Sequence, residues 1–174
     1  MAAQGFRLFD TAIGRCGIAW GDRGILGVHL PGRRMRAEHG APPGAVEQAI
    51  DGIRALLRGE PSDLSGVPLD MERVPAFHRR VYEAARAIPP GATLTYGEVA
   101  ARIGAPAEAR EVGQALARNP FALVVPCHRV VAAGGRAGGF SAPGGVATKR
   151  RLLAIEGART AAQPELFGPG GGIG

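Results

Sequence analysis

The chain has 174 residues, enough for one domain of ordinary size or for two small ones. Its hydrophobic content of 45% supports a packed core, yet no stretch is long and apolar enough to span a bilayer, and the N-terminus lacks the layout of a secretion signal. Two unevenly placed cysteines do not suggest a disulfide framework, so a reducing, cytoplasmic location is expected.

The net charge of +6 is concentrated in one part of the chain. Residues 1–71 carry as many acids as arginines, whereas residues 72–156 hold the whole positive surplus. Such a distribution suits a polyanionic partner, nucleic acid above all. The alternative is an arginine-rich composition with solvated faces, since Lys149 is the single lysine.

Residues 1–70 predict a small, strand-rich unit. Short strands are expected over Phe6–Trp20 and Gly24–Leu30, with a turn at residues 21–24 between them. Residues 46–58 have the pattern of an amphipathic helix, and residues 61–68 that of an extended linker. The apolar face of the helix consists of Val46, Ile50, Ile53, Leu56 and Leu57.

Residues 71–158 predict a mainly helical unit. One helix is expected over Ala76–Ala87 and a second over Tyr96–Ile103, where Thr95 and Glu98 can form a capping box. A third helix is expected over Ala107–Arg118. Two short helices around a Gly/Pro turn follow the plan of a helix-turn-helix, although many helical hairpins bind no DNA.

The third predicted helix carries unusually small side chains. A slim helix can approach DNA closely, and an arginine such as Arg110 near its start can enter the base stack or the minor groove. Close packing against a neighbouring helix would require the same small residues. They are Ala107, Ala109, Gly113, Ala115 and Ala117.

Cys127 follows an apolar run, Phe121–Val125, that is expected to be a buried strand closed by Pro126. His128 is the next residue, and a thiol beside an imidazole is a candidate nucleophile. A buried cysteine that packs as a small hydrophobic residue is the alternative.

Six ordered motifs between Phe77 and Gly157 closely resemble those of the O6-alkylguanine-DNA alkyltransferases, or methylated-DNA–protein-cysteine methyltransferases. The resemblance implies an α+β fold with a ribonuclease-H-like unit over residues 1–70 and a winged helix-turn-helix-like unit over residues 71–158. The Ala/Gly/Pro-rich composition of residues 159–174 predicts a flexible tail. Residues 1–70 match only loosely. The motifs are Ile88-Pro89-Pro90-Gly91, Thr95-Tyr96-Gly97-Glu98, Arg110-Glu111-Val112-Gly113, Asn119-Pro120, Pro126-Cys127-His128-Arg129-Val130-Val131 and Leu152-Leu153-Ala154-Ile155-Glu156-Gly157.

The resemblance also implies roles for individual residues. Cys127 would accept the alkyl group, His128 would take the thiol proton through a bound water, and Glu156 would hold and polarise that histidine. Asn119 would tie the preceding turn to the active-site segment, and Tyr96 would help rotate the 3′ phosphate and donate a hydrogen bond to the leaving guanine. Arg110 would fill the gap left by a flipped nucleotide. Further DNA contacts would come from Tyr96, Ala109, Gly113, Gln114, Ala115 and Arg129, and the pocket wall from Pro126, Val130, Gly138, Phe140 and Ser141.

The implied activity is repair of O6-alkylguanine in double-stranded DNA, with O4-alkylthymine as an open question. The base would be flipped out of the duplex, and its alkyl group would move irreversibly to Cys127, once per molecule. No metal or organic cofactor is required, and Cys16, His29 and His39 form no convincing ligand set. Phe140 and the Ala142-Pro143 pair depart from the family pattern, which leaves the preferred alkyl group open.

The C-terminal tail contains Gln163-Pro164-Glu165-Leu166-Phe167, which resembles the short peptide by which bacterial repair proteins bind the replication sliding clamp. Packing of Leu166 and Phe167 on the protein body is the alternative.

Three other functional classes stay in view. A non-catalytic relative that binds alkylated bases and recruits other repair factors would lack the cysteine. A Cys-His hydrolase would need a second histidine motif or an oxyanion-hole signature. A helix-turn-helix regulator would leave Cys127, Asn119 and Glu156 unexplained.

Overall fold

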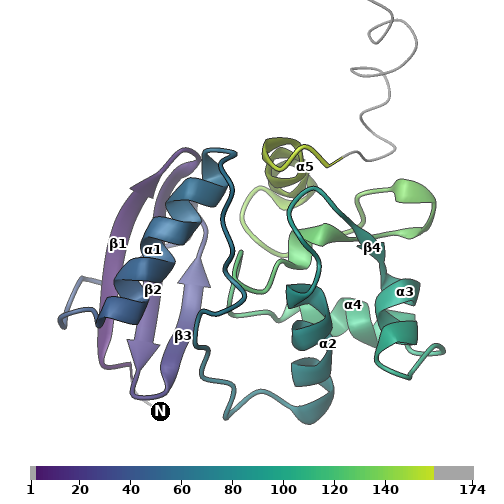
Figure 1. The fold of residues 1–174 in the computed structure, drawn as a ribbon, viewed down its shortest axis with the longest axis horizontal. Coiled ribbons are helices and arrows are strands. Elements are labelled where there is room, and N and C mark those ends of the chain that lie inside the picture. Colours follow the sequence, from purple (N-terminus) through teal and green to yellow (C-terminus); the bar gives the residue numbers. More distant parts are fainter. Residues whose placement is uncertain (1–2, 159–174) are drawn as a thin grey trace, which may run out of the picture.

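The computed structural model describes residues 3–158, and its first part is a three-stranded antiparallel sheet with one helix. The strands β1 (Gly5–Thr11), β2 (Gly14–Gly21) and β3 (Gly24–His29) lie in the order β1-β2-β3. Helix α1 (Gly44–Leu57) lies across one face of this sheet (Figure 1). The apolar face predicted for this helix is confirmed, because all five of its predicted side chains are buried.

The region predicted as strand over Phe6–Trp20 is two strands, β1 and β2, with a turn between them. The Thr11 hydroxyl stabilises this turn, since it donates to the Gly14 carbonyl and accepts from the Ile13 amide. Gly14 has a φ of 121°, which favours glycine. The predicted turn at residues 21–24 is confirmed.

The second part of the structure is built mainly of short helices (Figure 1). They are α2 (Ala76–Arg86), α3 (Tyr96–Arg102), α4 (Ala109–Ala117) and α5 (Gly145–Ile155), with the 3-10 turns η1 (Cys127–Arg129) and η2 (Ala133–Gly135). Strands β4 (Leu94–Thr95) and β5 (Val130–Val131) form a parallel pair. The capping box is confirmed, because Thr95 and Glu98 each bond the other's backbone amide. None of the helices within residues 3–158 has the length and apolarity needed to cross a membrane.

Residues 121–125 form a turn, so the strand predicted there is wrong. The Val125 amide donates to the Phe121 carbonyl at 2.8 Å, and Leu123 has a φ of 71°. The run is apolar because Phe121, Leu123, Val124 and Val125 are buried as a turn inside the core. Apolarity alone cannot distinguish a short buried strand from another buried segment.

Strand β3 connects the two parts. The Ile25 amide donates to the Pro68 carbonyl at 2.9 Å, and farther along the Val28 amide donates to the Pro120 carbonyl at 2.9 Å. Residues of both parts belong to one continuous cluster of buried apolar side chains. The sheet is therefore bonded directly to the segment that leads to Cys127.

Arg86 provides a second connection. From α2, its Nη2 donates to the carbonyl oxygens of Leu64, Ser65 and Val67, at 3.0, 3.0 and 2.8 Å. One guanidinium thereby satisfies three carbonyls of the segment between α1 and α2, which has no regular secondary structure of its own to bond them.

Candidate active site around Cys127

Cys127 begins the 3-10 turn η1, directly after Pro126. Asn119 closes the turn that precedes it. The Asn119 Nδ2 donates to the Val125 carbonyl at 2.9 Å, and its Oδ1 accepts from the Phe121 amide at 2.9 Å. One side chain therefore fixes both ends of the turn, while Cys127 itself is half-buried and remains accessible.

A single carboxylate at the end of α5 binds both residues that follow Cys127. The Glu156 side chain is 3% exposed and accepts from His128 Nε2 at 2.8 Å and from Arg129 Nη2 at 2.9 Å. Arg129 also donates through Nε to Glu156 at 2.9 Å and through Nη1 to the Ile88 carbonyl at 2.7 Å. Burial opposes ionisation of Glu156, but the hydrogen bonds and charges of His128 and Arg129 prevail and lower its pKa to about 2.

His128 is held as a neutral imidazole. Burial lowers the pKa of His128 although the Glu156 carboxylate acts in the opposite direction. Because ionised Glu156 can only accept, Nε2 carries the ring hydrogen and Nδ1 bears the lone pair. Nδ1 is buried and has no hydrogen-bond partner within residues 3–158. It is the nitrogen free to accept a proton from a nearby thiol.

Opposing influences act on the Cys127 thiol. Burial raises the pKa of Cys127, whereas the Asn119 side chain and the charge of Lys149 act to lower it. Burial prevails, so the thiol is protonated at neutral pH and needs a base to become a nucleophile. Cys16 packs in the core, and burial raises its pKa to about 11.

Lys149 is a site residue that the sequence analysis missed. Its side chain on α5 is 1% exposed, and Nζ donates to the Val130 carbonyl at 2.7 Å and to the Gly139 carbonyl at 3.1 Å. Burial lowers the pKa of Lys149 to about 8, so it is mostly protonated at pH 7. The signal available in the sequence was helical spacing, since Lys149 shares a face of α5 with the buried Leu152 and Leu153.

Tyr96 contacts Lys149 and lines the same cavity as Cys127. The Lys149 Nζ donates to the Tyr96 hydroxyl oxygen at 3.4 Å, which leaves the hydroxyl hydrogen free to point elsewhere. Burial raises the pKa of Tyr96, so the hydroxyl remains a donor. Gly138 packs against it with a φ of 76°, and a Cβ at this position would lie 2.9 Å from the hydroxyl oxygen. Only glycine fits here without displacing the tyrosine.

A cavity of about 300 Å³ has Cys127 on its wall, together with Tyr96, Gly113, Leu116, Ala117, Gly139, Phe140 and Ser141. Its size is in the range of small-ligand sites. Phe140 and Ser141 were predicted to line the pocket, and they do; the Ser141 hydroxyl donates to the Ala117 carbonyl at 2.8 Å.

Three of the predicted pocket residues lie elsewhere. Gly138 packs on Tyr96, and Val130 and Pro126 are buried. The Val130 carbonyl accepts a hydrogen bond from Lys149. None of the three is among the residues that line the cavity at Cys127.

Helix α4 presents small residues beside Tyr96. A Cβ at Gly113 would lie 3.8 Å from the Tyr96 ring, and Gly113 itself lines the cavity. Arg110 and Gln114 are exposed on this helix, and Ala109 is half-buried. These four positions remain available for contact with a ligand outside the protein.

Two predicted DNA contacts are wrong. Ala115 is fully buried, and its carbonyl accepts from the Tyr82 hydroxyl at 2.7 Å. Arg129 is buried as well, with its guanidinium bound to Glu156 and Ile88. Both side chains belong to the interior of the protein.

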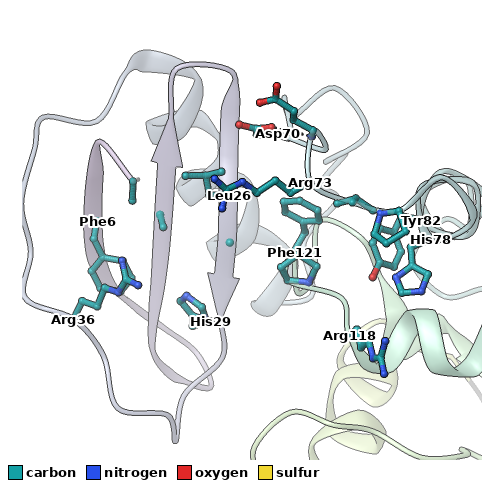
Figure 2. A pocket seen from close by; sticks show the side chains of 17 residues that line it. Phe6, Leu26, His29, Arg36, Asp70, Arg73, His78, Tyr82, Arg118 and Phe121 are labelled. Atoms are coloured by element: carbon teal, nitrogen blue, oxygen red, sulfur yellow. Dashed lines mark hydrogen bonds between the residues drawn. The ribbon is translucent and has the colours of Figure 1, made fainter. Parts of the chain in front are cut away.

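A larger cavity, of about 550 Å³, lies apart from Cys127 (Figure 2). Phe6 and Leu26 of the sheet, His78 and Tyr82 of α2, and Phe121 are among its lining residues. Cys127 and His128 are not, so the chemistry is not located there. Within residues 3–158, no three His, Cys, Asp or Glu side chains are grouped so that they could hold a metal ion.

Several known proteins are similar to this chain in sequence and in structure. A family model described as "6-O-methylguanine DNA methyltransferase, DNA binding domain" matches residues 76–158. The methylated-DNA–protein-cysteine methyltransferase of Methanothermobacter thermautotrophicus is 43% identical over 142 residues, which cover 81% of this chain and 78% of that protein. The one from Mycolicibacterium paratuberculosis is 38% identical over 168 residues, covering 93% and 98%.

The structural comparison covers nearly the whole chain. A crystal structure of Mycobacterium tuberculosis OGT in complex with DNA matches with a TM-score of 0.75 and 38% identity, over 93% of this chain and 98% of that one. Fold and site together thus define a mixed α/β protein that presents an accessible thiol on a cavity wall next to a buried histidine–carboxylate pair. The chain belongs to the methylated-DNA–protein-cysteine methyltransferase family.

The buried carboxylate predicts an acid-sensitive stability. An unfolded glutamate protonates near pH 4.3, roughly its ordinary pKa, whereas Glu156 stays ionised down to a pKa of about 2 in the folded protein. The pairing therefore stabilises the fold fully above the ordinary pKa and is lost as the pH falls through the folded one. Glu156→Gln should remove this part of the acid dependence and, at pH 7, lower the free energy of unfolding by on the order of 3 kcal/mol, because Arg129 loses its partner.

Urea denaturation across pH 2–7 would measure both effects. Glu60→Gln is the matched control, since Glu60 pairs with Arg58 at the surface and should contribute little. An identical acid dependence in the Glu156→Gln variant and the unmodified protein would contradict the prediction.

Lys149 is expected to tune the Cys127 thiol. Lys149→Met removes the positive charge that lowers the pKa of Cys127, so the thiol should react several-fold more slowly at a given pH, with its titration midpoint moved upward. Iodoacetamide labelling at a series of pH values, with peptide mapping to separate Cys127 from Cys16, measures this. Arg150→Met, on the exposed side of α5, serves as control, and faster labelling of Lys149→Met would refute the electrostatic role.

Proposed function

We propose that this protein repairs O6-alkylguanine in double-stranded DNA by moving the alkyl group irreversibly to its own Cys127, once per molecule. The observation that carries the proposal is a thiol on a cavity wall beside a neutral histidine whose orientation is fixed by an ionised carboxylate. The name of the relatives describes methyl transfer from methylated DNA to a protein cysteine. A nucleophile, a base and an orienting group are what such a transfer requires.

The site residues account for each step. The thiol proton passes to His128 Nδ1, directly or through one water molecule, and Glu156 stabilises the imidazolium that forms. The sulfur then attacks the alkyl carbon, and the bond from that carbon to O6 breaks with its electron pair on guanine. Tyr96 donates a hydrogen bond to the departing base, which lowers the barrier by stabilising the developing negative charge.

Irreversibility follows from the product. The alkyl group ends in a thioether, and a thiolate is a poor leaving group from such carbon. The base leaves as unmodified guanine, while the protein keeps the carbon. Each molecule therefore completes one reaction, and the amount of protein sets the number of lesions removed.

DNA recognition is assigned to α3 and α4 as a helix-turn-helix, with α4 against the minor groove. Its small residues allow close approach, and exposed Arg110 can occupy the space of a flipped nucleotide. Extruding a base costs roughly a few kcal/mol, which contacts along the bent duplex offset. The DNA complex of the Mycobacterium tuberculosis relative supports DNA as the partner.

Finer features of the organisation belong to the same proposal. Residues 1–70 would form a ribonuclease-H-like unit around the β1–β3 sheet, and residues 71–158 a winged helix-turn-helix-like unit. A cytoplasmic, nucleoid-associated location suits a protein acting on chromosomal DNA. The clamp-binding peptide at residues 163–167 lies outside the described residues and stays a prediction.

The alternative of a non-catalytic lesion-binding relative is less well supported. Such a protein needs the flipping helix but no nucleophile. Here Cys127 is present, and the two residues that follow it, His128 and Arg129, form a buried network with Glu156. Buried charges destabilise a fold unless they are fully paired, so a protein that carries out no chemistry has no need of this network.

Direct transfer of label tests the proposed reaction. Protein incubated with duplex DNA carrying radiolabelled O6-methylguanine should take up one methyl group per molecule, on Cys127. Cys127→Ser should reduce uptake below detection, because the hydroxyl is a far weaker nucleophile, while DNA binding is retained. Cys16→Ser is the matched control and should transfer normally. Label that stays on DNA, or more than one equivalent consumed per protein, would sink the proposal.

Base extrusion is expected to depend on Arg110. Arg110→Ala should reduce base extrusion by about 10-fold or more, because the space that the flipped base leaves in the stack is no longer filled. A fluorescent base analogue opposite the lesion reports the extrusion. Affinity for undamaged duplex should fall much less, since one phosphate-neutralising charge among many is lost. Arg102→Ala, an exposed arginine of α3, provides the comparison. Equal losses in both variants would exclude a specific role for Arg110.

A further inference from the structure

Cys127 lies on the wall of a second cavity. Besides the cavity under Tyr96, another of about 430 Å³ reaches the thiol from the side of β3. The two cavities therefore adjoin at the reactive sulfur. Five residues line both of them, namely Leu116, Ala117, Cys127, Phe140 and Ser141.

The two cavities differ in charge. Apart from Tyr96 and Cys127, the first has no ionisable residue on its wall. The second is lined by Arg33, Arg118 and His29 and by no aspartate or glutamate. His29 and Arg118, both labelled in Figure 2, also line the larger cavity described above, whose wall differs in that it includes the acids Asp70 and Glu72.

The basic side chains of this second cavity are not neutralised by neighbours. Within residues 3–158, the ion pairs of the protein include neither Arg33 nor Arg118. Burial lowers the pKa of His29, and the charges of Arg33 and Arg36 lower it further. An anion placed here would gain attraction without displacing an existing partner.

The wall contributed by the strand-rich part is held in place. The Val28 amide bonds the Pro120 carbonyl at 2.9 Å, which anchors the end of β3 beside Asn119. Gly32 lies so close to Pro143 that a Cβ on Gly32 would be 2.7 Å from Pro143 Cβ. Thr148 of α5 holds Pro143 from the other side of the sequence, because its hydroxyl donates to the Pro143 carbonyl at 2.7 Å. The Ala142-Pro143 pair, a departure from the family pattern, is thus part of this cavity.

We infer that the second cavity is a subsite for the distal end of the transferred alkyl group and that Arg33 and Arg118 select alkyl groups carrying a carboxylate. The inference rests on the proposed function. In the displacement, sulfur, the reacting carbon and O6 lie in line, so any further atoms of the alkyl group project sideways from that axis. The uncharged first cavity holds the base, and the second offers space and cations for the substituent. O6-carboxymethylguanine is the simplest lesion of this class.

The reaction on such a lesion balances without another reactant. The bond from Cys127 sulfur to the methylene carbon forms, and the bond from that carbon to O6 breaks with its electron pair on guanine. The thiol proton leaves through His128 and ends on guanine. The carboxylate is unchanged and remains attached to Cys127 as a carboxymethyl thioether.

The test compares two lesions of equal size in the same duplex. One carries O6-carboxymethylguanine and the other its neutral amide, so that DNA binding and base flipping cancel in the ratio of their transfer rates. Arg33→Ala should lower the carboxylate-to-amide ratio about 3- to 10-fold, since one exposed charge contributes modestly, and adding Arg118→Ala should lower it further. Arg33→Lys should restore most of the carboxylate-to-amide ratio. Arg34 does not line the cavity, so Arg34→Ala should show the same ratio as the unmodified protein.

Two further arms separate the possible failures. Transfer from O6-methylguanine is measured in parallel, and if Cys127 receives no alkyl group from any lesion, the proposed function itself fails. If methyl and amide lesions react but the ratio is the same with and without Arg33 and Arg118, the subsite alone is wrong. With the unmodified protein, raising the salt concentration should lower the ratio, and a ratio independent of salt would also overturn the subsite.

Discussion

The site depends above all on the Glu156 carboxylate, which lies buried between His128 and Arg129. An ionised carboxylate in the interior is strongly unfavourable unless it is paired and hydrogen-bonded, and here two basic side chains donate three hydrogen bonds to Glu156. The same arrangement fixes the position of α5 relative to η1, because a small displacement would leave a buried charge unpaired. It also leaves Nδ1, and not Nε2, as the imidazole nitrogen without a hydrogen-bond partner among the described residues. Fold stability and the direction of proton transfer therefore share one interaction.

The strand-rich part contributes more than support. Its last strand bonds the Pro120 carbonyl next to Asn119, and Asn119 in turn closes the turn that presents Cys127. The position of the sulfur is thus set from two sides, by α5 through Glu156 and by β3 through Pro120. A single apolar cluster runs through both parts, which makes independent movement of the sheet and the helical part costly. This arrangement explains how residues around Arg33, far from the cysteine in sequence, come to line a cavity at the thiol.

Elements with a local cause were predictable from the sequence. Helix α1 has a continuous apolar stripe, and α3 has a capping box whose two hydrogen bonds involve only Thr95 and Glu98, so both could be located within a few residues. Features with a tertiary cause were not. Residues 121–125 look like a strand, yet Asn119 and the surrounding core hold them as a turn with Leu123 at positive φ. Arg129 and Lys149 look like solvated cations, and only the location of Glu156, Val130 and Gly139 turns them inward. Resemblance placed the nucleophile, but it could not tell which of its neighbours face the cavity.

A protein that reacts once needs a thiol that is slow toward other electrophiles, and the electrostatics of the site provide this. Burial keeps Cys127 protonated, while Lys149, whose charge acts in the opposite direction, is hydrogen-bonded to carbonyl oxygens and to the Tyr96 hydroxyl. A fully formed thiolate would be alkylated or oxidised by small molecules entering either cavity. A protonated thiol beside a neutral imidazole becomes nucleophilic only as its proton moves, which is favourable when an alkyl carbon with a good leaving group is already in line. The raised pKa of Cys127 is consequently a form of selectivity. It links activation of the sulfur to the presence of a flipped, correctly placed base and keeps the reaction with other electrophiles slow.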